Sequence, residues 1–255
     1  MSTMDTAYVT STRQGSLQIV EFYHPQSNSL PRTLLTQLAA SITAAGEDAE
    51  INVVLLRSGG ERVFCAGASF DELASITTAA EGLRFFSGFA EVINAIRTCP
   101  VPVIGRIQGK CVGGGVGLAA AVDYALATDS AQVKLSELAV GIGPFVVGPA
   151  VERKIGVSAF SQLAFDATAW RSAAWAHERG LFAELFEDMA GLDEGVNRLV
   201  AQLLQSSPAA LKEIKKICWE GTEHWTQLLQ HRASISGRLL LTEESKKAIE
   251  RITKK

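Results

Sequence analysis

The 255-residue sequence has little excess charge of either sign. Its 24 Lys and Arg residues stand against 27 Asp and Glu residues, which gives a net charge of −3. No run of Lys and Arg occurs beyond scattered pairs near the C-terminus. A nucleic-acid-binding surface needs a basic patch to neutralise phosphates. We therefore expect no nucleic-acid partner.

Long apolar runs are also missing. A membrane-spanning helix needs about twenty consecutive apolar residues, and the longest candidate, residues 112–127, is interrupted by Gly113, Gly114, Gly115 and Asp123. The first sixteen residues are polar and poor in Arg, and they contain no apolar segment of the kind found in secretory signals. The sequence thus predicts a protein without membrane association, located in the cytoplasm.

Metal-binding and disulfide patterns are absent as well. The four cysteines are spread without CxxC spacing, which is typical of free thiols in a reducing compartment: Cys65, Cys99, Cys111 and Cys218. The four histidines are isolated, and no spacing typical of zinc ligands occurs. Neither a P-loop nor the G-x-S-x-G turn of a serine hydrolase is present. We therefore expect no metal ion.

What the sequence does contain is a regular alternation of strand and helix patterns. Apolar residues make up 47% of the chain and charged residues 20%, which predicts a large buried core. Over roughly the first 150 residues, β-branched runs such as 51–58 alternate with helical patterns such as 31–46, and this favours an α/β fold. Only helical patterns follow residue 158. We expect a core over residues 1–195 and a helical C-terminal region over 196–255.

One segment, residues 107–124, is unusually rich in glycine. It reads IQGKCVGGGVGLAAAVDY, with three adjacent glycines at 113–115 and another close behind them at Gly117. Glycine weakens both strands and helices. We therefore expect that something approaches this segment too closely for side chains to be present. A dinucleotide-binding fingerprint is excluded because the spacing is GxGxG rather than GxGxxG. Tight packing of a helix on a sheet is a second explanation.

A second segment of small residues, FCAGASFDEL at 64–73, resembles the first in placing them where a strand meets a helix. A helix N-terminus offers unpaired N–H groups and the positive end of its dipole. Two such termini facing one pocket could both donate to one oxygen, and this would form an oxyanion hole for a carbonyl that becomes an enolate. The paired segments therefore favour a carbonyl oxygen as the group that approaches the bare backbone.

These segments together resemble the crotonase superfamily, which is the enoyl-CoA hydratase/isomerase family. The order and spacing of NSL at 28–30, FCAGASFDEL at 64–73, PVIGRIQGKCVGGGVGLAAAVDYALA at 102–127 and LSELAVGI at 135–142 match that family. The resemblance implies a spiral of ββα units with two roughly perpendicular sheets. It also implies that the helical C-terminal region packs on partner subunits in a homotrimer, or in a hexamer made of two trimers.

The resemblance further implies a site for acyl-CoA thioesters, in which coenzyme A is part of the substrate and no separate cofactor is needed. The two oxyanion donors of the family fall on the backbone N–H groups of Ala68 and Gly114. Ala66 matches the position whose backbone meets the CoA adenine. The neighbouring Gly67 and Gly113 are expected to line the same substrate site.

The acidic residues decide which reaction the resemblance implies. Hydratases of the family hold a water between two glutamates, of which one falls on Glu137 and the other on Gly117, where no carboxylate is present. A single glutamate at the position of Glu137 resembles the Δ3,Δ2-enoyl-CoA isomerases. Phe145 stands where hydratases have glycine, and we expect it to fill part of the space that a water would need.

The resulting prediction is an isomerase in which Glu137 moves a proton between two carbons of the acyl chain. If Glu137 is buried, its pKa should be raised, which makes it a better base near neutral pH. Three alternatives remain open. They are a hydratase in which Asp71 or Glu72 supplies the missing acid, another enolate-forming reaction such as decarboxylation, and a catalytically silent acyl-CoA-binding protein.

Overall fold

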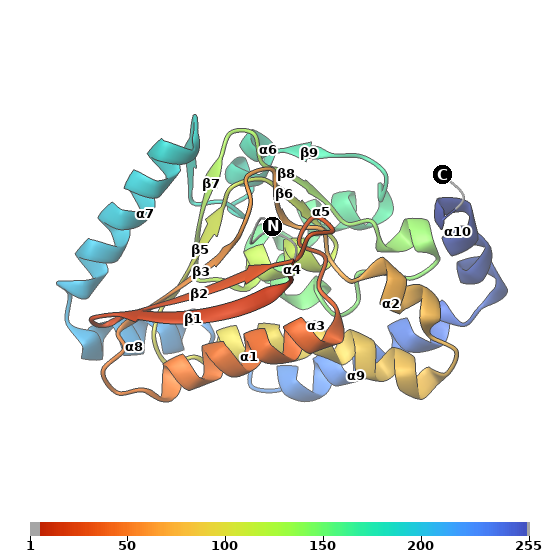
Figure 1. Ribbon diagram of the computed structural model, residues 1–255, viewed down its shortest axis with the longest axis horizontal. Helices are drawn as coiled ribbons and strands as arrows, with labels where there is room; N and C mark the ends of the chain where they lie inside the picture. Colours follow the sequence, from red (N-terminus) through yellow and green to blue (C-terminus); the bar gives the residue numbers. More distant parts are fainter. Residues whose placement is uncertain (1–5, 254–255) are drawn as a thin grey trace.

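The computed structural model describes residues 6–253 and consists of two sheets surrounded by helices (Figure 1). Residues 1–5, which belong to the segment predicted to lack a secretory signal, lie outside the described residues. The strands are β1 (Tyr8–Gln14), β2 (Leu17–Tyr23), β3 (Val53–Ser58), β4 (Val63–Cys65), β5 (Val103–Ile107), β6 (Lys110–Val112), β7 (Tyr124–Thr128), β8 (Gln132–Lys134), β9 (Arg171–Ser172) and β10 (Glu184–Phe186). The helices are α1 (Arg32–Glu47), α2 (Phe70–Ser75), α3 (Ala79–Thr98), α4 (Gly114–Ala121), the 3-10 helix η1 (Glu137–Val140), α5 (Gly148–Phe165), α6 (Ala173–Glu178), α7 (Met189–Leu204), α8 (Pro208–Cys218), α9 (Trp225–Leu240) and α10 (Glu243–Thr253).

The larger sheet has six strands in the order β1-β2-β3-β5-β7-β10. All neighbours are parallel except the hairpin of β1 and β2. The central strands β3 and β5 are almost entirely buried, as expected for strands covered on both faces. The sequence patterns did not predict β1, because most of its side chains are exposed and it carries no apolar face.

The smaller sheet pairs β4, β6 and β8 in parallel and adds β9 antiparallel to β8. Its strands are at most three residues long, so they contribute little packing of their own. Because β4, β6 and β8 are parallel, their carboxyl ends lie at the same end of this sheet. The loops after these three strands therefore lie close together, and the small sheet serves to position them.

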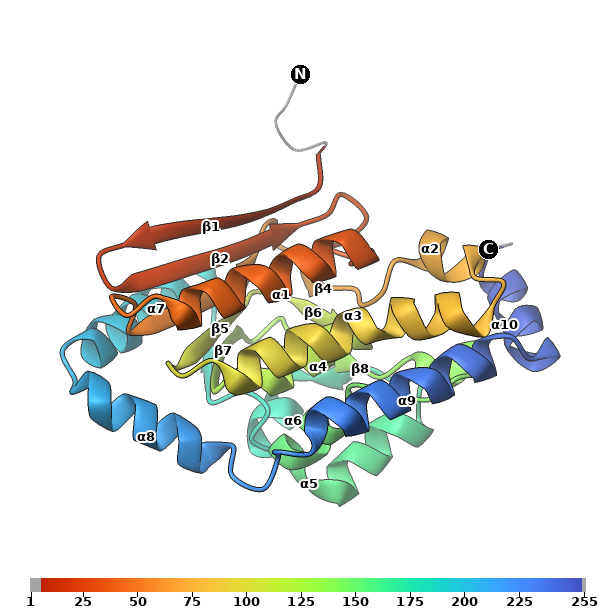
Figure 2. The same cartoon turned by 90° about the horizontal axis from the view of Figure 1, so that it is seen from below.

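Three helices lie side by side along one side of the molecule, with α3 between α1 and α9 (Figure 2). The start of α3 is set by a capping box, in which Thr78 and Glu81 each bind the backbone N–H of the other. The backbones of α3 and α9 come into direct contact at two glycines, since a Cβ on Gly82 would lie 2.6 Å from the Cα of Gly237. The crossing of these helices therefore depends on the absence of side chains at both positions.

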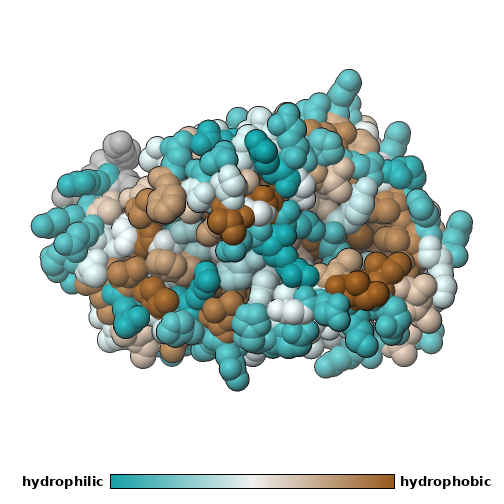
Figure 3. Space-filling model, turned by 180° about the vertical axis from the view of Figure 1, so that it is seen from behind, coloured by the Kyte–Doolittle hydropathy of each residue, from teal (hydrophilic) through white to brown (hydrophobic). Residues whose placement is uncertain are grey.

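The helical C-terminal region does not form a separate layer within the chain. The predicted boundary at residue 195 falls inside α7, whose Leu192 and Val196 pack on the large sheet. Helix α9 packs on α3 of the same chain. The assembly into trimers stays a prediction. Exposed apolar side chains occur on α5 (Val157, Phe165) and α8 (Ile214, Ile217), and Figure 3 shows that the hydrophobic areas of one face are separated by hydrophilic ones.

The α/β class predicted from the sequence is confirmed, with two mixed sheets and helices at the C-terminal end. Within residues 6–253, no helix has the length and apolar character required to cross a membrane.

Candidate active site

The glycine-rich segment connects strand β6 to helix α4. Gly113 follows the strand with φ of +51°, a conformation that L-residues with side chains rarely adopt. A Cβ at this position would lie 3.1 Å from Oε1 of Glu137. Glycine is therefore required here both by the turn and by the close approach of the Glu137 carboxylate.

Three further glycines of the segment, Gly114, Gly115 and Gly117, are packed against protein atoms. A Cβ on Gly114 would collide with the ring of Phe89, one on Gly115 with the carbonyl of Cys65, and one on Gly117 with the side chain of Val147. Close packing of α4 thus accounts for Gly115 and Gly117, which was the second explanation considered for the bare backbone. Gly114 differs from these two because it also lines a cavity.

The second segment of small residues, at 64–73, lies directly beside the glycine-rich segment. Strand β4 pairs with β6, so Cys65 lies opposite Cys111. Gly67 follows with φ of +88°, and a Cβ on it would lie 2.8 Å from the carbonyl oxygen of Val112 and 3.3 Å from the nitrogen of Gly114. The two segments that the sequence singled out are therefore in contact, at the ends of neighbouring strands.

A buried asparagine holds the second segment, at 64–73, in place. Asn28 has φ of +55°, which asparagine tolerates better than most residues. Its Nδ2 donates to the carbonyls of Gly59 (2.8 Å) and Val63 (2.9 Å), and its Oδ1 accepts from the N–H of His24 (2.9 Å). The turn brings Leu30 alongside Ala68, where the N–H groups of Leu30 and Ser69 complete the bridge.

The two predicted oxyanion donors keep free N–H groups in this arrangement. Among the described residues, neither the N–H of Ala68 nor that of Gly114 has a hydrogen-bond acceptor. Gly114 is the first residue of α4, so its N–H points out of the helix at the positive end of the dipole. Both residues line the same cavity, so two N–H groups remain available to a ligand there.

Glu137 lies at the start of η1, after strand β8. The residue as a whole keeps partial exposure, but its Oε2 atom is buried and has no hydrogen-bond partner. Burial raises the pKa of Glu137 from its ordinary value of 4.5 to about 7, against a smaller opposing effect of its own backbone N–H. The expectation of a raised pKa is confirmed, and such a carboxylate is well matched to accept a proton near neutral pH.

Residue 117 is a glycine, so no second carboxylate faces Glu137 from that position. The two alternative acids have other partners. Glu72 Oε2 accepts from the N–H of Arg32 (2.7 Å) at the start of α1, and Glu72 does not line the cavity. Asp71 lines the cavity but is exposed and accepts a hydrogen bond from Gln26 (3.0 Å). Among the described lining residues, Glu137 is therefore the only buried carboxylate.

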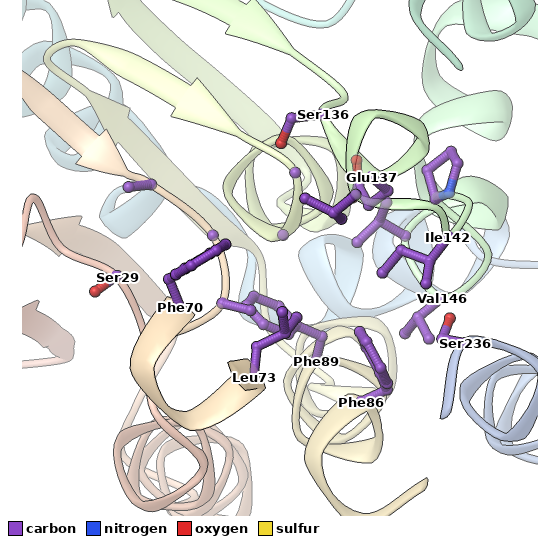
Figure 4. Close-up of a pocket in the computed structure, with 18 of the residues that line it drawn as sticks. Ser29, Phe70, Leu73, Phe86, Phe89, Ser136, Glu137, Ile142, Val146 and Ser236 are labelled. Carbon is purple, nitrogen blue, oxygen red and sulfur yellow. The ribbon is translucent and has the colours of Figure 1, made fainter. Parts of the chain in front are cut away.

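The cavity measures about 380 Å³ and contains every predicted site residue. Ala66, Gly67, Ala68, Gly113, Gly114, Glu137 and Phe145 all line it. Figure 4 shows Glu137 above Phe89, with Ser29 and Phe70 on one side and Val146 and Ser236 on the other. The ring of Phe145 lies against Gly143. Val147 packs on Gly117, the position without a carboxylate. That Phe145 fills the space of a water stays a prediction.

Several lining residues were not found from the sequence. They are mostly apolar and come from distant parts of the chain: Phe86, Phe89, Ile142, Val147 and Ser236. The aromatic residues of α3 have the spacing of an ordinary core-facing helix, and α9 carries no motif. Only the contacts between α3, α9 and the loop after η1 bring these side chains into the site.

Comparisons with known proteins identify relatives of this chain. The model of the enoyl-CoA hydratase/isomerase family matches residues 12–253. Human mitochondrial methylglutaconyl-CoA hydratase is 32% identical over 200 residues, which cover 77% of this chain and 58% of that protein. The peroxisomal Δ(3,5)-Δ(2,4)-dienoyl-CoA isomerase of Arabidopsis thaliana is 26% identical over 238 residues, covering 87% and 84%.

A solved structure supports the fold. The crystal structure of an enoyl-CoA hydratase from Bacillus halodurans superposes with a TM-score of 0.88 and covers 96% of this chain and 99% of that one, at 23% identity. This likeness confirms the crotonase fold. The chain spans about 58–63% of the length of the mammalian methylglutaconyl-CoA hydratases that it matches. From the family match and the fold together, the chain belongs to the enoyl-CoA hydratase/isomerase family.

Proposed function

We propose that the protein is an enoyl-CoA isomerase that converts 3-enoyl-CoA into 2-enoyl-CoA thioesters with one catalytic base. The observation that carries this proposal is a single buried carboxylate, Glu137, whose pKa is raised to about 7 beside the free N–H groups of Ala68 and Gly114. The packing of Val147 on Gly117 supports it, because no second carboxylate can hold a water there.

In the proposed reaction the thioester oxygen accepts hydrogen bonds from the N–H groups of Ala68 and Gly114. Glu137 removes a proton from C2, and the resulting negative charge moves onto the thioester oxygen as an enolate. The two donors stabilise this charge as it forms. Glu137 then returns the proton to C4, and the double bond moves from C3–C4 to C2–C3. Nothing is consumed, so one base is sufficient.

The pH dependence of the rate follows from the raised pKa of Glu137. The base must be ionised in the free enzyme, and the ionised fraction falls as pH drops through about 7. We expect kcat/KM for a 3-enoyl-CoA to be constant above pH 7 and to fall about tenfold per pH unit below it. The measurement is a pH–rate profile between pH 5 and pH 9. An inflection near pH 4.5 instead would contradict the burial argument.

A second candidate is hydration of 2-enoyl-CoA. It is favoured by the name of the human relative and by Asp71, an acid that lines the same cavity. The two candidates differ in what the wild-type protein does with crotonyl-CoA, whose conjugated thioester absorbance disappears on hydration. The proposed isomerase should hydrate it slowly compared with its turnover of a 3-enoyl-CoA. Hydration at a comparable rate would favour the hydratase and overturn the proposal.

The missing carboxylate can be restored by substitution. Glutamate has a higher helix propensity than glycine. Gly117→Glu alone is nevertheless expected to destabilise the fold, because its Cβ would meet Val147. Val147 precedes α5 as its N-cap, where glycine is well tolerated. We expect Gly117→Glu/Val147→Gly to fold and to hydrate crotonyl-CoA faster than the wild type. Val147→Gly alone is the control, and an equal gain in it would exclude the new carboxylate as the cause.

A further inference from the structure

The cavity has a polar mouth and an apolar interior. At the mouth, the exposed Gln26 and Asp71 are hydrogen bonded to each other, and Ser29 lies on the same side as Phe70 (Figure 4). Beyond Glu137 the walls are side chains of α2, α3, η1 and the loop after η1: Leu73, Phe86, Phe89, Val140, Ile142 and Val146. We call this part of the cavity the acyl chamber.

The acyl chamber contains no positive charge. None of the described residues that line the cavity is a Lys, Arg or His. Away from the mouth, the polar side chains are those of Glu137, the adjacent Ser136, and Ser236 of α9, which is 1% exposed. Figure 4 shows Ser236 beside Val146, on the side opposite Ser29. The far side of the chamber therefore offers one hydroxyl group and otherwise apolar surface.

This composition discriminates between acyl groups. An apolar acyl chain that enters the chamber leaves water and gains free energy in proportion to the apolar area buried. A carboxylate at the far end of the chain would lose its hydration without a cation to replace it. It would also add a second negative charge to a site in which Glu137 must ionise. Both effects act against a dicarboxylic acyl group.

The volume of the cavity limits the length of the chain. The volume of about 380 Å³ covers the whole cavity, its polar mouth included. The thioester and the adjoining atoms of the pantetheine arm take up part of this space. A chain that outgrows the acyl chamber must leave part of its apolar surface in water.

We propose that the acyl chamber selects uncharged acyl groups and rejects acyl groups that end in a carboxylate. This inference rests on the proposed function in that the ligand is an acyl-CoA. It separates this chain from the human relative, whose name specifies methylglutaconyl, an acyl group with a second carboxylate.

The test compares the binding of saturated acyl-CoAs, which cannot react. Hexanoyl-CoA and adipyl-CoA have the same number of carbons and differ by the terminal carboxylate. By calorimetric titration of the wild-type protein, we expect adipyl-CoA to bind at least about a hundredfold more weakly, and affinity to rise from butyryl-CoA to octanoyl-CoA. If the affinity for adipyl-CoA is within threefold of that for hexanoyl-CoA, the inference is wrong, but the proposed function is unaffected. Failure of every acyl-CoA to bind more tightly than free coenzyme A would overturn the proposed function as well.

A substitution in the chamber tests its far side independently. Val146→Leu adds bulk next to Ser236 and shortens the space available to the chain. We expect octanoyl-CoA to lose about tenfold in affinity relative to butyryl-CoA, whereas Val146→Ala should favour octanoyl-CoA. Thermal unfolding establishes that each variant is folded. An unchanged preference in both folded variants would contradict the placement of the acyl chain.

Discussion

The variant Glu137→Gln is expected to lose at least about a hundredfold in turnover of a 3-enoyl-CoA, which is the low end of what general acid–base catalysis contributes. Glutamine keeps the shape of the side chain and removes its ability to take up a proton. The buried Oε2 has no hydrogen-bond partner to lose, so the fold should persist. The measurement is the formation of the conjugated 2-enoyl thioester by its absorbance, together with titration of a saturated acyl-CoA, whose binding should survive.

The matched control is Glu72→Gln, which makes the same chemical change on a nearby helix. The Glu72 side chain accepts from the N–H of Arg32 outside the cavity, and a glutamine oxygen can still accept that bond. We expect turnover within about threefold of the wild type, because no group that contacts substrate changes. If Glu137→Gln retains wild-type turnover, the base is another residue and the proposed mechanism is wrong.

The second large effect is expected from removing an oxyanion donor. Replacing Gly114 by proline would remove one N–H but would also drive side-chain atoms into Phe89, so the structure directs the test to Ala68. The N–H of Ala68 takes no part in the bridge to Leu30, and the preceding Gly67 tolerates the restriction that proline imposes on its neighbour. We expect Ala68→Pro to lower kcat by about a hundredfold to a thousandfold, the cost of one such donor in other enzymes.

The control for Ala68→Pro is Ala68→Val, which adds bulk at the same position and keeps the N–H group. Circular dichroism and thermal unfolding establish that both proteins are folded. A large loss in the proline variant with a small loss in the valine variant supports the oxyanion role. Equal losses in both would show that the position matters for shape alone, and Ala68 would then be withdrawn as a donor.

Most of the fold could be predicted because its long elements have strong local patterns. Helices such as α3 and α7 follow the helical spacing of apolar residues, and β3 begins with four consecutive apolar residues. The strand β1 could not be found this way, because its exposed side chains produce no contrast between two faces. The break at Gly156 within α5, where φ is +76°, could not be predicted either, because a single residue with non-helical backbone does not change the spacing of apolar residues around it.

The site could be predicted where it depends on backbone motifs. The strand-to-helix connections at Gly67 and Gly113 need positive φ, and the glycines at these positions make that requirement visible in the sequence. The side chains that enclose the cavity form no motif that could be recognised in the sequence. Val147 meets Gly117 only after α5 packs on α4, and Ser236 enters the cavity only because α9 lies on α3. Contacts between distant segments of this kind have no periodicity that a single sequence can reveal.

The glycine pair at the crossing of α3 and α9 has a consequence for how substrate preference can change. Gly82, Phe86 and Phe89 follow one another along a single face of α3, and Gly237 is the neighbour of Ser236 on α9. If the acyl chain occupies the chamber as proposed, the distance between the two helix axes sets how far the chamber extends. A methyl group added at residue 82 would meet the backbone of Gly237 and force the helices apart. We therefore expect substitutions at this crossing to change the preferred chain length while Glu137 and the N–H donors stay as they are.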